Sequence, residues 1–147
     1  MTEGRGNDRG ERGHAGHEHL SHVPDATRPA VFAARAVVRT VTPAHGDQLE
    51  SDVTAFLAAL SDGLAEAGCR LVGHVKGSIA AVGRGDLTFH VTALGSAPAI
   101  TGGFAGMVEE AELTINVIVF GVDECELPAI VRDAWSRASH AVAVWRG

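Results

Sequence analysis

The chain has 147 residues, of which 46% are hydrophobic and 20% charged, enough for one compact domain with its own core but too few for two. Its formal net charge of -6 argues against a dedicated nucleic-acid binder, because such proteins usually carry an excess of Lys and Arg. No apolar run approaches the ~18 residues of a membrane span, and the N-terminus lacks the apolar stretch of a signal peptide. The sequence therefore predicts a cytoplasmic protein that binds neither nucleic acid nor a membrane.

The first 29 residues differ in composition from the rest of the chain. They are rich in Gly, His and charge and cannot bury enough apolar surface to offset their ordering entropy, so we expect a disordered tail over 1–29 and a single domain over 30–147. Four of the eight histidines follow the pattern H-x-x-H-x-H-x-x-H in this tail: His14, His17, His19 and His22. Imidazoles favour Zn, Ni and Co, and a flexible segment can wrap several around one ion. The pattern predicts a metal-binding tail, with an incidental polar tail as the alternative.

The pattern from Ala30 onward is that of a folded domain. Residues 31–41 carry β-branched side chains on both parities, which is typical of a strand buried on one face and partly covered on the other. The apolar residues that follow recur at the spacing of one helical face, which predicts a helix over 46–67. Gly68 tolerates left-handed geometry just past the end of that helix.

Two segments of alternating apolar and polar residues, 70–82 and 86–92, predict a β-hairpin. Directly opposed residues must point to the same face, so the length of the loop fixes which side chains lie together. A three-residue loop at 83–85, with Gly85 at its positive-φ position, keeps both apolar sets on one face.

That register has a consequence for the two histidines of the hairpin. It pairs His90 with Ser78 and sets His90 four residues out of step with His74, a separation of roughly 13 Å at about 3.3 Å per residue. We therefore expect that the two imidazoles cannot share one metal ion unless a partner chain brings them together.

The second half of the domain adds two more strands and a helix. Residues 95–111 form a long connection with several glycines, which predicts a functional or mobile loop. The alternation at 112–120 predicts a strand, and Asp123 with Glu126 resembles a capping box in front of a second helix. Residues 140–145 predict a short final strand.

The predicted order is therefore β-α-β-β-β-α-β with a mainly antiparallel sheet. The simplest architecture packs both helices on one face of that sheet, an α+β two-layer sandwich of the ferredoxin-like or a related type. The opposite face of the sheet then carries mostly polar side chains. We predict that this face presents Arg35, Arg39, His74, Lys76, Ser78, Thr88, His90, Thr92, Thr114 and Asn116.

This polar face is locally basic although the protein is acidic. Arg35, Arg39 and Lys76 predict a site for an anion or an acidic partner, or a surface for self-association as a homo-oligomer. The alternative is a solvated sheet face whose Lys and Arg side chains oppose aggregation. The face lacks the exposed aromatic side chains on which single-stranded nucleic acids stack.

Motifs for enzymatic chemistry are absent from the sequence. Neither a phosphate-binding loop nor G-x-S-x-G occurs, and Cys69 and Cys125 have no evident His partner, so we expect no nucleotide cofactor and do not favour an enzyme. The second hypothesis is a small-ligand binder or enzyme whose pocket is formed by 95–111 together with the side chains of the hairpin: His74, Lys76 and His90.

Two segments show a resemblance to a known family. LVGHVKGSIAAVG, with Lys76 and Gly77, and the later ELTINVIVFGVDECELPAIVRDAW resemble, in this order, the C-terminal domain of CobW-type metallochaperone GTPases. The resemblance spans about 31–135. Since the phosphate-binding loop and the C-x-C-C motif of that family are missing here, it implies only an accessory module linked to metal homeostasis, with Lys76 and Gly77 as the matching positions.

Together these observations predict a non-enzymatic accessory or binding module. Its tail would bind Zn, Ni or Co, and its basic sheet face would bind an anion, a protein partner or a second copy of the chain. The predicted ligand-binding residues are Arg35, Arg39, His74, Lys76, Gly77 and His90.

Overall fold

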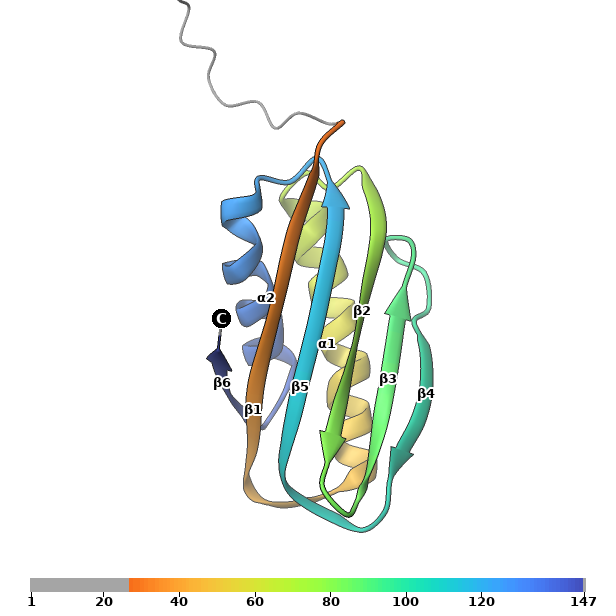
Figure 1. The fold of residues 1–147 in the computed structure, drawn as a ribbon, viewed down its shortest axis with the longest axis vertical. Coiled ribbons are helices and arrows are strands. Elements are labelled where there is room, and N and C mark those ends of the chain that lie inside the picture. The colour runs from red at the N-terminus through yellow and green to blue at the C-terminus, as the bar shows by residue number, and fades with distance from the viewer. Residues whose placement is uncertain (1–26, 147) are drawn as a thin grey trace, which may run out of the picture.

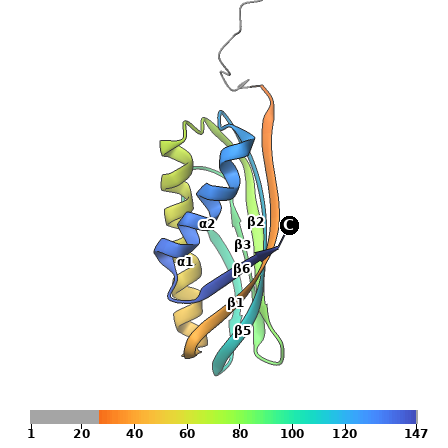
Figure 2. The same cartoon turned by 90° about the vertical axis from the view of Figure 1, so that its left-hand side faces the viewer.

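The computed structural model describes residues 27–146, which form one sheet with two helices packed on one of its faces (Figures 1 and 2). The elements are β1 (Pro29–His45), α1 (Gly46–Glu66), β2 (Leu71–Ala81), β3 (Gly85–Val91), β4 (Ala99–Phe104), β5 (Met107–Phe120), a 3-10 turn (Glu124–Glu126), α2 (Leu127–Ala138) and β6 (Val142–Arg146). The predicted α+β two-layer arrangement, with both helices on one face, is confirmed. The predicted histidine tail, including His14, His17, His19 and His22, lies outside the described residues.

The sheet has six strands in the order β4-β3-β2-β5-β1-β6, and every neighbouring pair is antiparallel. The helix α1 connects β1 to β2, and these two strands flank β5. The helix α2 connects β5 to β6, and these flank β1. The two helical crossovers are therefore interleaved, and β1 and β5 pair along the middle of the sheet (Figure 1).

The core lies between the helices and the inward face of the sheet. Phe56 of α1 and Trp135 of α2 meet edge to face, with ring centroids 5.3 Å apart. The indole Nε1 of Trp135 donates a hydrogen bond to the carbonyl of Ala141 at 3.0 Å, so the largest core side chain leaves no polar atom unsatisfied. These contacts join both helices to the residue that precedes β6.

The prediction of a loop over 95–111 is wrong for most of that segment. Residues 99–104 form β4, an edge strand paired with β3, and β5 begins already at Met107. Both faces of β4 are largely exposed, so it has no alternating apolar pattern that sequence analysis could detect. The observed order is thus β-α-β-β-β-β-α-β, with one strand more than predicted.

The hairpin between β2 and β3 has a three-residue loop, but the loop is shifted by one position. It spans 82–84, because Ala81 pairs with Gly85 and the side chain of Val82 is fully exposed. Gly85 has the expected positive φ of 116°, and a Cβ there would press on the backbone carbonyl of Gly103 in β4. The prediction is off by one residue because Val82 is apolar and continues the alternating pattern of the strand, although it lies in the loop.

A second irregularity lies at the start of β2. The register against β5 shifts between Val72 and His74, which is the signature of a β-bulge. Val72 is buried as a result, whereas Leu71, which would share the inward face with Val75 and Ile79 if the strand alternated strictly, is 60% exposed. The strict alternation expected from the sequence holds only beyond this bulge.

Candidate functional site

The face of the sheet opposite the helices is open to solvent, because no element of residues 27–146 covers it (Figure 2). Cross-strand pairing arranges its side chains in rows. The first row reads His90, Lys76, Asn116 and Ala33; the second reads Thr88, Ser78, Thr114, Arg35 and Arg146; the third reads Asp86, Ala80, Glu112, Val37 and Val144. Basic side chains therefore occupy the first two rows and acidic side chains the third.

The first two rows surround a shallow depression of about 700 Å³. Lys76 stands on one side of it, and Arg35 and Arg146 stand on the other; we call these three residues the basic cluster. Its other lining residues are small or neutral: Ala33, Ala34, Gly77, Thr114, Ile115 and Asn116. The depression exists because small side chains in the centre of the sheet lie between long cationic ones at its rim.

Two arginines of this cluster occupy opposed positions on neighbouring strands. Arg35 of β1 and Arg146 of β6 are directly opposed across the two strands. Like charges at opposed positions destabilise a sheet, by an amount comparable to the roughly 0.2–1 kcal/mol by which favourable pairs stabilise it. Neither arginine forms an ion pair with another residue of the described chain, and neither does Lys76. The cluster is therefore a concentration of positive charge with no acidic partner within 27–146.

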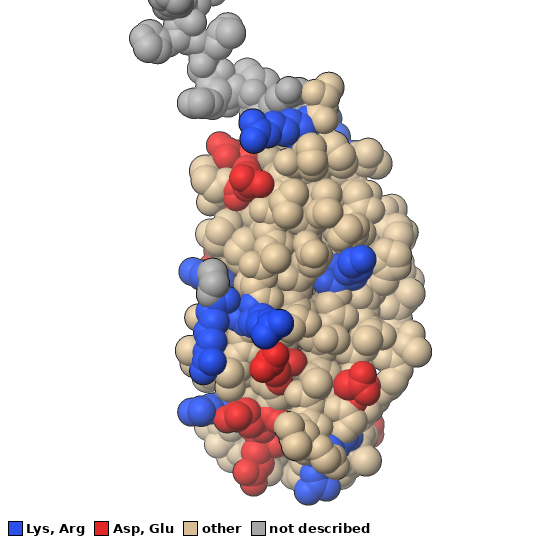
Figure 3. Space-filling view, in the orientation of Figure 1, with Lys and Arg blue, Asp and Glu red and all other residues tan. Residues whose placement is uncertain are grey.

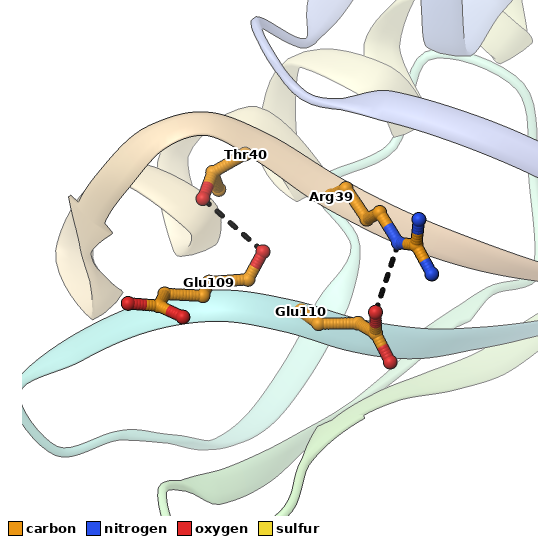
Figure 4. Close-up of polar contacts among 4 residues, drawn as sticks. All are labelled: Arg39, Thr40, Glu109 and Glu110. Carbon is orange, nitrogen blue, oxygen red and sulfur yellow. Dashed lines mark hydrogen bonds and ion pairs between the residues drawn. The ribbon is translucent and has the colours of Figure 1, made fainter.

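Arg39 has a different environment from these three cations. Its Nε atom lies 2.9 Å from Oε2 of Glu110 on β5, and both side chains are more than half exposed (Figure 4). The neighbouring Thr40 donates a hydrogen bond at 3.2 Å to the backbone carbonyl of Glu109. Of the three predicted cationic residues, Arg39 is the one that residues 27–146 already neutralise.

Polar atoms line the floor of the depression. The hydroxyl of Thr114, one of the lining residues, lies 2.9 Å from that of Ser78 on the neighbouring strand and shares a hydrogen bond with it. The Oδ1 atom of Asn116 is buried without a hydrogen-bond partner in the structure. A half-turn of the Asn116 side-chain amide exchanges its oxygen and its NH2 group. The same position then offers a hydrogen-bond donor in place of an acceptor.

The two hairpin histidines do not line the depression. His90 lies opposite Lys76 rather than Ser78, so it is two residues out of step with His74 and not four. Diagonal positions of this kind are about 7–8 Å apart, which makes the expected separation of roughly 13 Å an overestimate. The Nε2 atom of His74 is buried and unpartnered. Within the part of the chain that the structure describes, no three His, Cys, Asp or Glu side chains come together as a metal site.

Gly77 serves the packing of the sheet. A Cβ at this position would press on the backbone carbonyl of Thr114 and lie 2.7 Å from Cζ of Phe89, which is buried beneath it. The absent side chain therefore lets β2 and β5 approach and leaves room for the Phe89 ring. This is a steric reason for glycine next to Lys76.

An acidic region follows directly along the strands. A second depression, of about 530 Å³, is lined by Glu109, Glu110 and Glu112, with Arg84 at its edge. Figure 3 shows the separation, with a group of Lys and Arg side chains at mid-height on the left of the sheet face and Asp and Glu side chains below it. The basic cluster and a mainly acidic region, which also includes Arg39 and Arg84, thus lie next to each other on this face; we call them its basic and acidic halves.

Sequence analysis missed one member of the basic cluster. The predicted final strand ends at 145, whereas β6 runs from Val142 to Arg146. The alternation of the strand continues through Arg146, so extending it by one residue would have placed this arginine on the outward face. Its position beside Arg35 depends on the pairing of β1 with β6, which the sequence pattern does not reveal.

Neither cysteine has the environment of an activated nucleophile. Burial raises the pKa of the Cys69 thiol. A hydrogen bond with the side chain of Asp123 is the main cause that raises the pKa of the Cys125 thiol. Reactive cysteines have a lowered pKa, produced by nearby positive charge or a helix N-terminus. Both thiols are therefore less ionised than a free cysteine at the same pH.

Comparisons with known proteins assign no relative to this chain. No family model, curated protein or solved structure matches it. The helices within residues 27–146 are too short or too polar to cross a lipid bilayer.

Proposed function

We propose that the protein is a non-enzymatic binding module that recognises an anionic group of its partner through the basic cluster. The observation that carries the proposal is the direct opposition of Arg35 and Arg146 without an acidic partner among the described residues. An arrangement of like charges that costs stability is best accounted for by a ligand of opposite charge.

The chemistry of the depression suits a carboxylate or phosphate group. A guanidinium offers several N–H donors in a planar fork that matches either group, and the ammonium of Lys76 adds a point charge from the opposite rim. The hydroxyl of Thr114, which shares a hydrogen bond with Ser78, supplies a further polar contact at the floor. The lining thus combines charge at the rim with small polar groups at the centre.

The alternative of an enzyme or small-ligand pocket built from 95–111, His74, Lys76 and His90 finds less support. Residues 99–104 are a paired edge strand, and the depression is lined by Lys76 but by neither histidine. A pocket of that composition would require the segment to fold back over the sheet. The binding module is therefore the better account of this face.

For the fold, the proposal is a ferredoxin-like sandwich enlarged by the hairpin β3-β4. Its support is the pair of interleaved crossovers, β1-α1-β2 around β5 and β5-α2-β6 around β1. The resemblance to the C-terminal domain of CobW-type metallochaperone GTPases stays part of the same proposal, resting on the two sequence segments that carry it. A shared fold would not by itself transfer a function.

The link to metal handling is proposed for the histidine-rich segment alone. Its support is the spacing of His14, His17, His19 and His22, since imidazoles bind Zn, Ni and Co. Calorimetric titration of the full chain with Zn and Ni should show binding that is lost when all four residues are replaced by Ala. Unchanged binding by the variant would contradict this part of the proposal.

The test of the anion site is a titration with inorganic pyrophosphate and with citrate at low ionic strength. We expect either probe to raise the thermal unfolding temperature of the full chain, and the double variant R35Q/R146Q to lose most of that shift. The control R132Q removes one positive charge from the exposed surface of α2. It should retain the shift in unfolding temperature. A shift that is the same in all three proteins would refute the basic cluster as the site.

A further inference from the structure

Two neighbouring parts of the open sheet face carry opposite charges, most of which, the Arg39–Glu110 pair excepted, do not pair within residues 27–146. The basic half holds Arg35, Lys76 and Arg146, and the acidic half holds Asp86 and Glu112 in the next row. None of these five side chains forms an ion pair with another described residue. The basic half of one copy could therefore pair with the acidic half of a second copy, and the reverse.

We propose that the anionic partner of the basic cluster is the acidic half of a second copy of this chain, in a dimer that packs sheet face to sheet face. This inference rests on the proposed function and names the partner of the same site. A twofold axis between the second and third rows, perpendicular to the strands, lays the second row of each copy, with Arg35 and Arg146, over the acidic third row of the other. Such an interface is isologous, and every contact occurs twice.

The rows indicate which residues meet. The second row of one copy lies over the third row of its partner, so Arg35 is brought to the strand next to Glu112 of the other copy. The first row, with Lys76, lies over the row of the Arg39–Glu110 pair. Two sheets packed in this way lie about 10 Å apart, a gap that Arg and Glu side chains bridge from both sides.

The face also has the area and the apolar surface that a stable dimer needs. Six strands about 4.8 Å apart, each about ten residues long at roughly 3.3 Å per residue, give a face of about 900 Å². Standard-size interfaces bury about 800 Å² per partner. Val144 lies in the third row, Val142 lies opposite Arg39, and Val31 lies on the same face beyond the first row; all three are 44–57% exposed, so closure would bury apolar side chains as well.

The test measures the mass of the full chain in solution by light scattering and sedimentation over a range of protein and salt concentrations. We expect twice the monomer mass at low salt and a dissociation constant that rises with salt, because the contacts are charged. The variants R35E/R146E and D86K/E112K each give a face of mostly one sign. Each alone should raise the dissociation constant by at least about tenfold.

Mixing the two charge variants provides the decisive result. The acidic face of R35E/R146E complements the basic face of D86K/E112K, so the mixture should restore a dimer that contains one copy of each. The control R132E changes a charge on α2, away from the face, and should dimerise like the unmodified chain. Thermal unfolding of every variant checks that it is folded.

Two outcomes would overturn the dimer. One is an unmodified chain that stays monomeric at all concentrations, and the other is a mixture of the variants that stays monomeric.

The anion titration separates this failure from that of the proposed function. If the monomer responds to pyrophosphate through Arg35 and Arg146, the basic cluster binds an anion but not a second copy. If a dimer forms that both charge variants leave intact, the charged rows are not its interface and this inference fails.

Discussion

The carboxylate of Asp52, buried on α1, accepts a hydrogen bond from the hydroxyl of Ser139 at 3.0 Å, across 87 residues of sequence. The same oxygen, Oδ2, also accepts from the backbone N–H of His140, and Oδ1 accepts from Nε2 of Gln48. The Ser139 hydroxyl oxygen in turn accepts from the backbone N–H of Ala141, just before β6. One buried carboxylate thus anchors the turn that leads from α2 to β6.

Replacing Asp52 by Ala should therefore destabilise the fold. The substitution leaves the Ser139 hydroxyl and the His140 N–H without their acceptor, and losing hydrogen bonds to a charged group costs about 2–3 kcal/mol. Urea unfolding measures the free energy, and D62A, an exposed change on the same helix, should alter it by less than about 0.5 kcal/mol. Equal free energies of unfolding for the two variants would show that the Asp52 contacts contribute nothing.

Gly77 is a second position where a small change should have a large effect. In G77A the new methyl group meets the carbonyl of Thr114 and the ring of Phe89, and overpacking against backbone should cost about 3 kcal/mol. Gly83 is the matched control, because its φ is 72° and a Cβ added there would meet no atom within 4 Å. G83N should cost less than about 1 kcal/mol, because Asn tolerates left-handed backbone. Thermal or urea unfolding of both variants is the measurement.

The opposed arginines lead to a prediction of opposite sign. In dilute protein at low salt, where no second copy is bound, R146Q should raise the free energy of unfolding by about 0.2–1 kcal/mol, since it removes repulsion from Arg35. The gain should fade as salt screens the charges. If R146Q is less stable than the unmodified chain at low salt, the pair is not repulsive, and the main support for the anion site is lost.

The pKa of Cys69 gives a prediction for alkaline pH. Burial raises this pKa, so in C125S, where Cys69 is the one remaining thiol, alkylation by iodoacetamide should have its pH midpoint above that of free cysteine. The folded state holds the proton more tightly than the unfolded state. The stability from this thiol is therefore intact below its ordinary pKa and is lost as the pH rises through the raised value.

Two measurements check this assignment. Mass spectrometry follows the alkylation of C125S, and urea unfolding compares the alkaline stability of the unmodified chain and C69S. The variant C69S should lose less stability between neutral and alkaline pH. A Cys69 that reacts with the midpoint of a free thiol would contradict the influence of burial.

Much of the fold follows from local patterns in the sequence. The helix predicted over 46–67 is observed over Gly46–Glu66, and Gly68 has the expected positive φ. These features depend on helical periodicity and on the left-handed residue that ends a helix, both of which are local. The alternating strands at 71–81 and 112–120 are recognisable for the same reason.

The errors arise where neighbours in space decide the outcome. The strand β4 has little buried surface and is held by pairing with β3, so no periodic pattern marks it. The bulge that exposes Leu71 is a mismatch between β2 and β5 and has no signature in either strand alone. The basic cluster needs β6 beside β1, and for that reason sequence patterns point to Arg35 but not to Arg146.

The interleaved crossovers also bear on how the chain folds during synthesis. Both neighbours of β1 in the sheet, β5 and β6, lie in the second half of the chain, so β1 has no strand to pair with until residues 107–120 have been made. The early product can form α1 and the hairpin of β2 and β3, which are local, but not the centre of the sheet. Such non-local pairing slows folding and leaves apolar strand edges open in the nascent chain. A ribosome-bound chain that stops before Met107 should therefore remain sensitive to proteases and dependent on chaperones, and protection should appear only once β5 emerges.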